Sequence, residues 1–157
     1  TDMAQLGTAI HACIAGSFTD PDAPLSLDEL DRTLNGMGVG DRVATASVLG
    51  TIETLHEWIG RRWPGHRAFA EVSVEARLDS GQILQGRIDL LLELDDRWVL
   101  FDHKSNPQGH EQWESVAQTA AGQLAAYRQA VELATGKPVS ECWLFFPVSA
   151  GAIRVEI

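Results

Sequence analysis

The sequence predicts an α/β domain in which helices flank a central sheet, and three patterns along the chain support this prediction. Apolar residues recur at helical spacing over Met3–Ala15, whereas from Phe69 onward apolar and polar residues alternate as they do in strands. A long helical pattern over Gln112–Thr135 is followed by the apolar run Cys142–Phe146, which is typical of a buried strand. The expected order is helix, helical insertion, three strands, helix and strand.

The region 17–64 is predicted to be a helical insertion near the N-terminus. Ser26 and Glu29 have the spacing of a capping box, so a short helix is expected to begin there. Asp41 is expected to cap a longer helix, which ends before Pro64 because proline cannot continue a helix. This region contains no evident catalytic motif.

Turn residues separate the strands of the second half. Asp79-Ser80-Gly81 is expected to be the turn of the first hairpin, and Asp95-Asp96 is expected to form a two-residue turn in the second. Gly136 lies where the long helix should end. The expected strands are Phe69–Leu78, Ile83–Leu94, Arg97–His103, Cys142–Phe146 and, as a further candidate, Ile153–Ile157.

Length and composition indicate one domain spanning residues 1–157. Of the 157 residues, 45% are hydrophobic and 22% are charged, and no apolar run approaches the roughly 20 residues of a membrane helix. No secretion signal opens the chain, and Thr1 in place of methionine predicts that the start is an excision or processing point. Cys13 and Cys142 are interpreted as buried free thiols, which favours a reducing, cytoplasmic compartment.

The formal net charge of −10 argues against a free-standing DNA-binding protein. Tight autonomous binding to duplex DNA usually depends on a basic surface, because neutralisation of phosphates supplies most of the affinity. An acidic domain that acts on DNA therefore needs another component to deliver the strand, either a fused motor domain or a partner subunit.

Asp89, Asp102 and Lys104 are the residues for which the sequence predicts chemistry. If Asp95-Asp96 is the turn, counting back from it places Asp89 opposite Asp102 on the neighbouring strand. The Cβ atoms of such an opposed pair lie about 4.5–5.5 Å apart. Lys104 follows Asp102 by two residues and therefore points to the same face of the sheet. Two carboxylates and one ammonium are thus expected to form a cluster.

Two opposed carboxylates between apolar strands destabilise a fold unless a cation lies between them. Oxygen ligands in an incomplete protein cage suit Mg²⁺ or Mn²⁺ better than zinc. Beside such an ion, Lys104 is expected to orient or activate a water and to stabilise negative charge on a phosphate. The alternative is that Asp102 and Lys104 form a strand-end ion pair and that Asp89 is a partly exposed edge residue.

The segments Gly86-Arg87-Ile88-Asp89 and Phe101-Asp102-His103-Lys104-Ser105-Asn106 resemble the metal-binding core of the PD-(D/E)XK nucleases. Two further segments, Gly7-Thr8-Ala9-Ile10-His11 and Gln123-Leu124-Ala125-Ala126-Tyr127, are similar to the Gly-x-x-x-His and Gln-x-x-x-Tyr helices of the RecB and AddA helicase–nucleases. The four motifs occur in the order of that family. The resemblance implies a restriction-endonuclease-like core, in which helices flank a mixed central sheet. It also implies that the chain is the C-terminal part of a longer helicase–nuclease.

The resemblance implies roles for four further groups. His11 and the backbone carbonyl of His103 would join the two aspartates as metal ligands, and Gln123 and Tyr127 would help to place the DNA strand. Taken without the resemblance, His11 on an apolar helix face is more typical of a hydrogen-bonded core histidine. Likewise, Gln123 and Tyr127 share one helix face and fit a polar pair that bridges helix and sheet.

Glu71 is left out of the predicted site. With a tight turn at Ser80-Gly81, Val72 and not Glu71 faces Asp89, although a one-residue slip would reverse this. The remaining histidines lack a partner pattern and are expected in loops or at the surface, and the tryptophans are expected to pack in the core. These residues are His56, His66 and His110, and Trp58, Trp98 and Trp143 among the tryptophans.

The predicted activity is that of a metal-dependent deoxyribonuclease. The resemblance implies an exonuclease-like enzyme that processes DNA ends in double-strand break repair and recombination. A covalently linked helicase and a partner subunit, as in AddAB and RecBCD enzymes, would deliver single strands. The chain has no Gly-x-x-x-x-Gly-Lys-Ser/Thr loop, so ATP binding is not expected. Two alternatives remain open: a catalytically silent domain that docks a motor or guides DNA, and a free-standing nuclease that acts on another nucleic acid.

Overall fold

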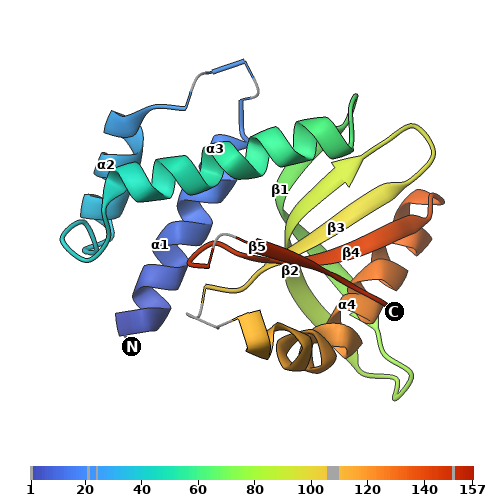
Figure 1. The fold of residues 1–157 in the computed structure, drawn as a ribbon. Coiled ribbons are helices and arrows are strands. Elements are labelled where there is room, and N and C mark those ends of the chain that lie inside the picture. Colours follow the sequence, from blue (N-terminus) through green and yellow to red (C-terminus); the bar gives the residue numbers. More distant parts are fainter. Residues whose placement is uncertain (1, 21, 24, 106–109, 150) are drawn as a thin grey trace.

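A five-stranded mixed sheet organises the fold, with the strands in the order β1-β2-β3-β4-β5 (Figure 1). The computed structural model describes residues 2–20, 22–23, 25–105, 110–149 and 151–157. β2 is antiparallel to both β1 and β3, β4 runs parallel to β3, and β5 is antiparallel to β4. The strands are β1 (Arg67–Arg77), β2 (Ile83–Glu93), β3 (Trp98–His103), β4 (Val139–Phe146) and β5 (Gly151–Val155).

Helices cover both faces of the sheet, which confirms the predicted α/β fold with a mixed central sheet. A parallel strand pair needs a crossover connection. The helix α4 (Trp113–Thr135), preceded by the 3-10 turn η1 (His110–Gln112), supplies it between β3 and β4 and covers one face. The opposite face is covered by α1 (Asp2–Ser17), α2 (Leu27–Gly36) and α3 (Thr45–Arg62), as Figure 1 shows. Among the described residues, no helix is both long and apolar enough to cross a membrane.

Two apolar cores result, one on each side of the sheet. The core under the three N-terminal helices contains Ile14, Ile52, Ile59, Leu90 and Phe101, each at most 1% exposed. The tryptophans pack in the core, as predicted. Trp58 makes edge-on contacts with Trp63 and Trp143, and Trp113 stacks on the buried Phe146. The core under α4 contains Ile88, Leu100, Leu124, Leu144 and Phe146.

The region 17–64 contains the two predicted helices, and α3 contributes several side chains to the larger core. Ser26 is the N-cap of α2, since its Oγ accepts a hydrogen bond from the Glu29 backbone N–H over 3.3 Å. The prediction that Asp41 caps the longer helix is wrong. The N-cap of α3 is Ala44, which has no side-chain acceptor, so this helix depends on packing of its buried face rather than on a cap.

The first hairpin turns through residues 79–81, as predicted. The Leu78 backbone N–H donates to the Gln82 carbonyl over 2.8 Å, and Gly81 N–H donates to the Leu78 carbonyl over 2.9 Å. The loop therefore comprises three residues, and a tight turn confined to 80–81 does not form. Gly81 has a φ of +86°, a conformation that glycine adopts without steric cost. The pairing of β1 with β2 consequently shifts by one residue.

Both strands of this hairpin exchange faces midway along their length. The pairs on either side place Glu71, and not Val72, opposite Asp89. Glu71 has a φ of +52°, which turns the strand out of its regular alternation. On one side of this point the inward residues are Ala68, Ala70, Leu90 and Leu92, which pack with the three-helix core. On the other side they are Val72, Val74, Leu84 and Ile88, which pack with α4.

Candidate functional site

The β2–β3 hairpin has the register predicted from its turn at residues 95–96. The Leu94 backbone N–H donates to the Arg97 carbonyl over 2.8 Å, and the strand pairs that follow keep the same register. One step beyond these pairs, Asp89 lies opposite Asp102, and the two carboxyl groups are hydrogen-bonding neighbours. The predicted juxtaposition of the two aspartates is confirmed.

Lys104 completes this cluster from the end of β3. Its Nζ lies 2.9 Å from Asp102 Oδ2, so both side chains lie on the same face, as predicted. The Asp102 side chain is only 14% exposed, whereas the Lys104 side chain is 32% exposed, so solvent reaches the pair from the side of Lys104. Parallel pairing fixes this position, because the Lys104 backbone N–H donates to the Phe145 carbonyl of β4 over 2.8 Å.

Burial separates the proton affinities of the two aspartates. For Asp102, burial and then the hydrogen bond with Asp89 raise the pKa, although Lys104 opposes this shift. For Asp89, burial acts in the same direction, but hydrogen bonding with His11 and the proximity of His103 outweigh it and hold the pKa well below its usual range. Asp89 therefore loses its proton more readily than Asp102 does.

His11 of α1 places an imidazole nitrogen beside the Asp89 carboxylate. Its Nδ1 lies 2.8 Å from the Gly7 carbonyl, while its Nε2 lies 3.6 Å from Asp89 Oδ2 and 3.1 Å from the His103 carbonyl oxygen. The His103 backbone N–H donates to Asp89 Oδ2 over 2.7 Å. Burial lowers the pKa of His11, but the hydrogen bond and charge of Asp89 outweigh it and raise the value to about 9. An imidazole, a carboxylate and a backbone carbonyl thus converge.

Gly7 allows α1 to approach this point closely. A Cβ atom on Gly7 would lie 3.1 Å from the Cβ of Ser105, which follows β3. Ser105 Oγ lies 3.2 Å from His11 Nδ1, the same ring nitrogen that contacts the Gly7 carbonyl. The sequence motif of Gly7 and His11 therefore has a packing reason, and Ser105 is a contributor to which the sequence analysis gave no role.

The arrangement fits a divalent cation by its donor set, but it is not a finished cage. In the part of the chain that the structure describes, no three His, Cys, Asp or Glu side chains already surround one point. Asp89 is the shared member, in contact with His11 on one side and with Asp102 on the other. Asp102 Oδ2 is buried and lies 2.9 Å from Lys104 Nζ, but no hydrogen bond to this oxygen is present among the described residues. A buried carboxylate oxygen in this condition is the kind of donor that a cation satisfies.

The imidazole of His103 lies beside the His11 ring, at a centroid distance of 5.6 Å, so, contrary to the prediction, it is not turned away from the site. It is buried, and its ring also packs edge-on against Phe145 at a centroid distance of 5.6 Å. Neither ring nitrogen has a hydrogen-bond partner among the described residues, and burial lowers the pKa of the ring to about 4. The backbone of His103 is therefore the part of this residue that bonds to the site directly.

Gln123 and Tyr127 of α4 occupy different positions relative to the cluster. Tyr127 is buried, and its ring covers the backbone of Gly86, where a Cβ atom would lie 2.2 Å from the hydroxyl oxygen. Burial raises the pKa of Tyr127, and the charges of the two aspartates act in the same direction. Gln123 is exposed and lines a cavity together with Lys104. The structure thus brings Gln123 to the solvent side of the site and Tyr127 to its floor.

Glu71 lies opposite Asp89 in the observed register, which corrects the expectation that Val72 occupies this position. Its exposed carboxylate nevertheless contacts Arg87, with an Oε2–Nη1 distance of 3.0 Å. A second correction concerns His56, which is half-buried in α3 and stacks on Phe18 at 4.0 Å instead of lying in a loop or at the surface.

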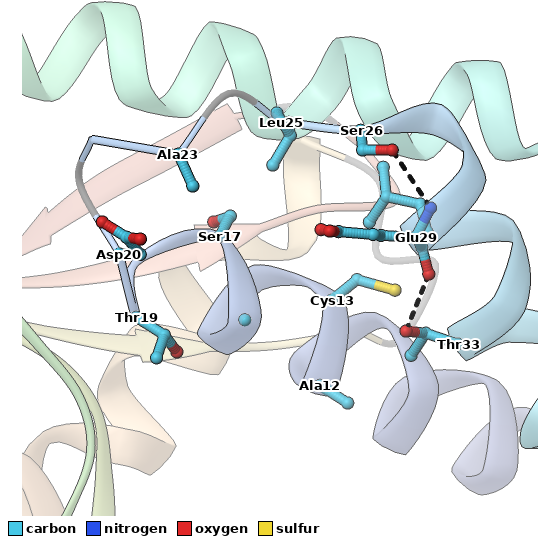
Figure 2. A pocket seen from close by; sticks show the side chains of 12 residues that line it. Ala12, Cys13, Ser17, Thr19, Asp20, Ala23, Leu25, Ser26, Glu29 and Thr33 are labelled. Atoms are coloured by element: carbon cyan, nitrogen blue, oxygen red, sulfur yellow. Dashed lines mark hydrogen bonds between the residues drawn. The ribbon is translucent and has the colours of Figure 1, made fainter.

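A separate cavity of about 310 Å³ lies between α1, α2 and the loop that joins them (Figure 2). The groups that Figure 2 connects satisfy one another, since Ser26 Oγ accepts from Glu29 N–H and Thr33 Oγ1 donates to the Glu29 carbonyl. Cys13 contributes its thiol to the lining, and burial raises the pKa of that thiol. None of the lining residues belongs to the cluster around Asp89.

Comparison with known proteins finds matches over the whole chain. The family model described as the PD-(D/E)XK nuclease superfamily matches residues 1–156. The chain is similar to proteins named as subunits of an ATP-dependent helicase/nuclease. It is 26% identical over 187 residues to that of Bacillus thuringiensis (98% of this chain and 14% of the relative). The corresponding values are 33% over 101 residues for Syntrophomonas wolfei and 30% over 105 residues for Desulforudis audaxviator, with 63% of this chain and 8% of the relative covered in each case. The chain therefore spans a small part of the length of these relatives.

Proposed function

The chain belongs to the PD-(D/E)XK nuclease superfamily, and we propose that it hydrolyses phosphodiester bonds of DNA with the help of a divalent cation. The observation that carries this proposal is the contact between Asp89 and Asp102 from neighbouring strands, with the Lys104 ammonium 2.9 Å from the second carboxylate. Two buried carboxylates in contact are unfavourable by themselves, so their presence together needs a compensating positive charge. Lys104 supplies part of this charge, and His11, whose pKa is raised to about 9 beside Asp89, supplies the rest until a cation takes the place of its proton.

Asp89, Asp102, His11 and the His103 carbonyl are the groups that would hold the cation. Mg²⁺ or Mn²⁺ suits this set, because oxygen donors predominate and an imidazole is tolerated. When bound, such an ion polarises a phosphoryl oxygen and lowers the pKa of a coordinated water. The close contact of Asp102 with Lys104 would have to loosen for Asp102 to serve as a ligand.

The other protein groups around the two aspartates have separate roles in this proposal. Lys104 lies at the exposed edge of the cluster, where its ammonium can hold the attacking water and stabilise negative charge on the phosphate. Gly7 and Ser105 orient the His11 ring through Nδ1, which leaves Nε2 directed at Asp89. Gln123, exposed beside Lys104, is suited to contact the strand, and Tyr127 supports the strand segment that carries Asp89.

We infer further that the domain works as the nuclease part of a helicase–nuclease that processes DNA ends in double-strand break repair. Two observations support this inference: the relatives are named helicase/nuclease subunits, and the chain covers at most 14% of their length. The net charge of −10 agrees with a domain that receives its strand from a motor in the same chain and from a partner subunit.

The test is cleavage of single-stranded DNA in the presence of Mg²⁺ or Mn²⁺, with Asp102→Asn and Asp96→Asn as a matched pair. Both substitutions remove one negative charge from the same hairpin, but Asp96 is exposed at the turn. Asp102→Asn is expected to reduce the rate more than about 100-fold, as loss of a metal ligand does at least as much as loss of its supporting groups. Asp96→Asn should change the rate by less than about twofold, as is usual for surface substitutions. Equal rates for both variants and the wild type, or no cation-dependent cleavage, would favour a structural or DNA-guiding domain.

A further inference from the structure

A groove with a volume of about 670 Å³ is lined by Lys104 and by residues of the first turns of α4. Its polar lining from this region comes from Gln112, Ser115, Thr119 and Gln123, all of which are exposed. Val116 and Ala120 contribute apolar side chains to the lining. The groove therefore includes the ammonium of the proposed nuclease site, and apart from Lys104 and Gln123 its lining residues have no role in the sequence motifs.

The polar groups form a continuous stripe along the helix. Ser115, Thr119 and Gln123 follow one another at intervals of four residues, so they lie on one face of α4. This stripe is about 12 Å long, given the helical rise of about 1.5 Å per residue. Bases in a stacked strand are about 3.4 Å apart, so several nucleotides fit along it.

The chemistry of the stripe suits a sugar–phosphate backbone. Hydroxyl and amide groups donate hydrogen bonds to phosphate oxygens, and such contacts position a strand without reading its sequence. The lining contains no carboxylate, although the whole chain carries a net charge of −10. A strand that binds to this neutral surface beside a single ammonium thus meets less electrostatic repulsion than it would elsewhere on this acidic protein.

We propose that this groove binds the backbone of a single nucleic-acid strand beside the phosphate that is cut, with Ser115 and Thr119 as its new contact residues. This inference rests on the proposed nuclease function for the identity of its ligand. Docking of a partner protein is the competing use of such a surface, and the experiment below distinguishes the two.

The test compares Thr119→Glu with Gln118→Glu in a binding assay that needs no cleavage. The two residues are adjacent and exposed on α4, and both substitutions add one negative charge, but only Thr119 lines the groove. The dissociation constant of a fluorescent oligothymidylate is measured by anisotropy at low ionic strength with EDTA. Thr119→Glu is expected to weaken binding about fivefold or more, because the new carboxylate would lie within a few ångströms of the backbone phosphates. Gln118→Glu should change the constant by less than about twofold.

A second measurement locates the strand directly. Thr119→Cys and Gln118→Cys are treated with an oligonucleotide that carries a pyridyl disulfide on a backbone phosphate. The cysteine thiolate displaces pyridine-2-thione, and the disulfide-linked complex is quantified. The native thiols Cys13 and Cys142 are buried and give little background. The linked complex should form at position 119 several times faster than at position 118.

The outcomes separate the two proposals. Equal weakening by both Glu variants, equal linkage at both positions, or no binding of the strand by the wild type would overturn the groove. Position-dependent binding without cation-dependent cleavage would leave the groove standing and remove the nuclease function. Loss of cleavage in Asp102→Asn together with equal binding by both Glu variants would do the reverse.

Discussion

Replacing Gly86 by alanine is expected to displace the Tyr127 ring and to destabilise the protein. A Cβ atom at this position would lie 2.2 Å from the Tyr127 hydroxyl oxygen and 2.8 Å from Cε1 and Cζ of the ring. Non-bonded carbon atoms are normally about 3.5–4.0 Å apart, so the ring has to move by roughly 1 Å. Tyr127 is only 5% exposed and packs in the core under α4, which leaves it little room. Overpacking of this kind costs about 1–3 kcal/mol.

The assay is urea denaturation followed by tryptophan fluorescence, with a double-mutant cycle. In a Tyr127→Ala background the obstacle is gone, so Gly86→Ala should then cost close to nothing or stabilise the strand by about 0.5–1 kcal/mol. The coupling between the two positions is therefore expected to be about 1–3 kcal/mol. Gly122→Ala is the matched control on α4, since a Cβ atom there meets nothing within 4 Å and should stabilise the helix by about 1 kcal/mol. If Gly86→Ala has the same cost in both backgrounds, the glycine is not required by the tyrosine.

Three further predictions concern stability and reactivity. Ser26→Ala removes the acceptor at the N-terminus of α2 and should lower the free energy of unfolding by about 1 kcal/mol, measured by urea denaturation. Burial tends to raise the pKa of Glu141, but hydrogen bonds from Trp63 and Arg62 outweigh it and lower the pKa in the folded protein. The carboxylate therefore contributes stability above the unfolded pKa, and the deficit of Glu141→Gln relative to the wild type should shrink as the pH falls below about 4.5. Burial raises the pKa of the Cys142 thiol to about 12, so alkylation at pH 8 should be slow in the native protein and fast in denaturant.

The second hairpin could be predicted because the sequence offers only one short connection between its strands, Asp95-Asp96. Asp95 and Asp96 stand between two apolar strands with no glycine or proline nearby, so a two-residue connection follows. That connection alone places Asp89 opposite Asp102, which the structure bears out. The core of the candidate site is therefore contained in a count of residues along the chain.

The first hairpin was not predictable to the same accuracy. A two-residue turn at 80–81 and a three-residue loop at 79–81 both use Gly81 in a left-handed conformation, and the sequence permits either. The choice moves every residue of β1 by one position relative to β2. It also decides that Glu71 lies opposite Asp89 in place of Val72.

Contacts between distant elements were also beyond the sequence. The approach of Gly7 to Ser105 and of Gly86 to Tyr127 depends on how α1 and α4 dock on the sheet. The polar stripe of α4 did leave a signal, since Ser115 and Thr119 continue the spacing of Gln123 toward the start of the helix. The role proposed for this stripe depends on Lys104 lining the same groove, which only the fold reveals.

The exchange of faces at Glu71 explains how one carboxylate serves both layers of the fold. In β3, Asp102 follows Leu100 on the side of α4, whereas His103 follows Phe101 on the side of α1. In a strand with regular alternation, the Asp89 side chain would lie on only one of these two sides of the sheet. Because β1 and β2 change faces at this point, Asp89 instead contacts Asp102 from the α4 side and His11 from the α1 side. A left-handed backbone at a residue other than glycine costs about 1–2 kcal/mol, and strain of this kind tends to lie at functional sites. The strained Glu71 is thus the local feature that lets one aspartate contact groups on both sides of the sheet.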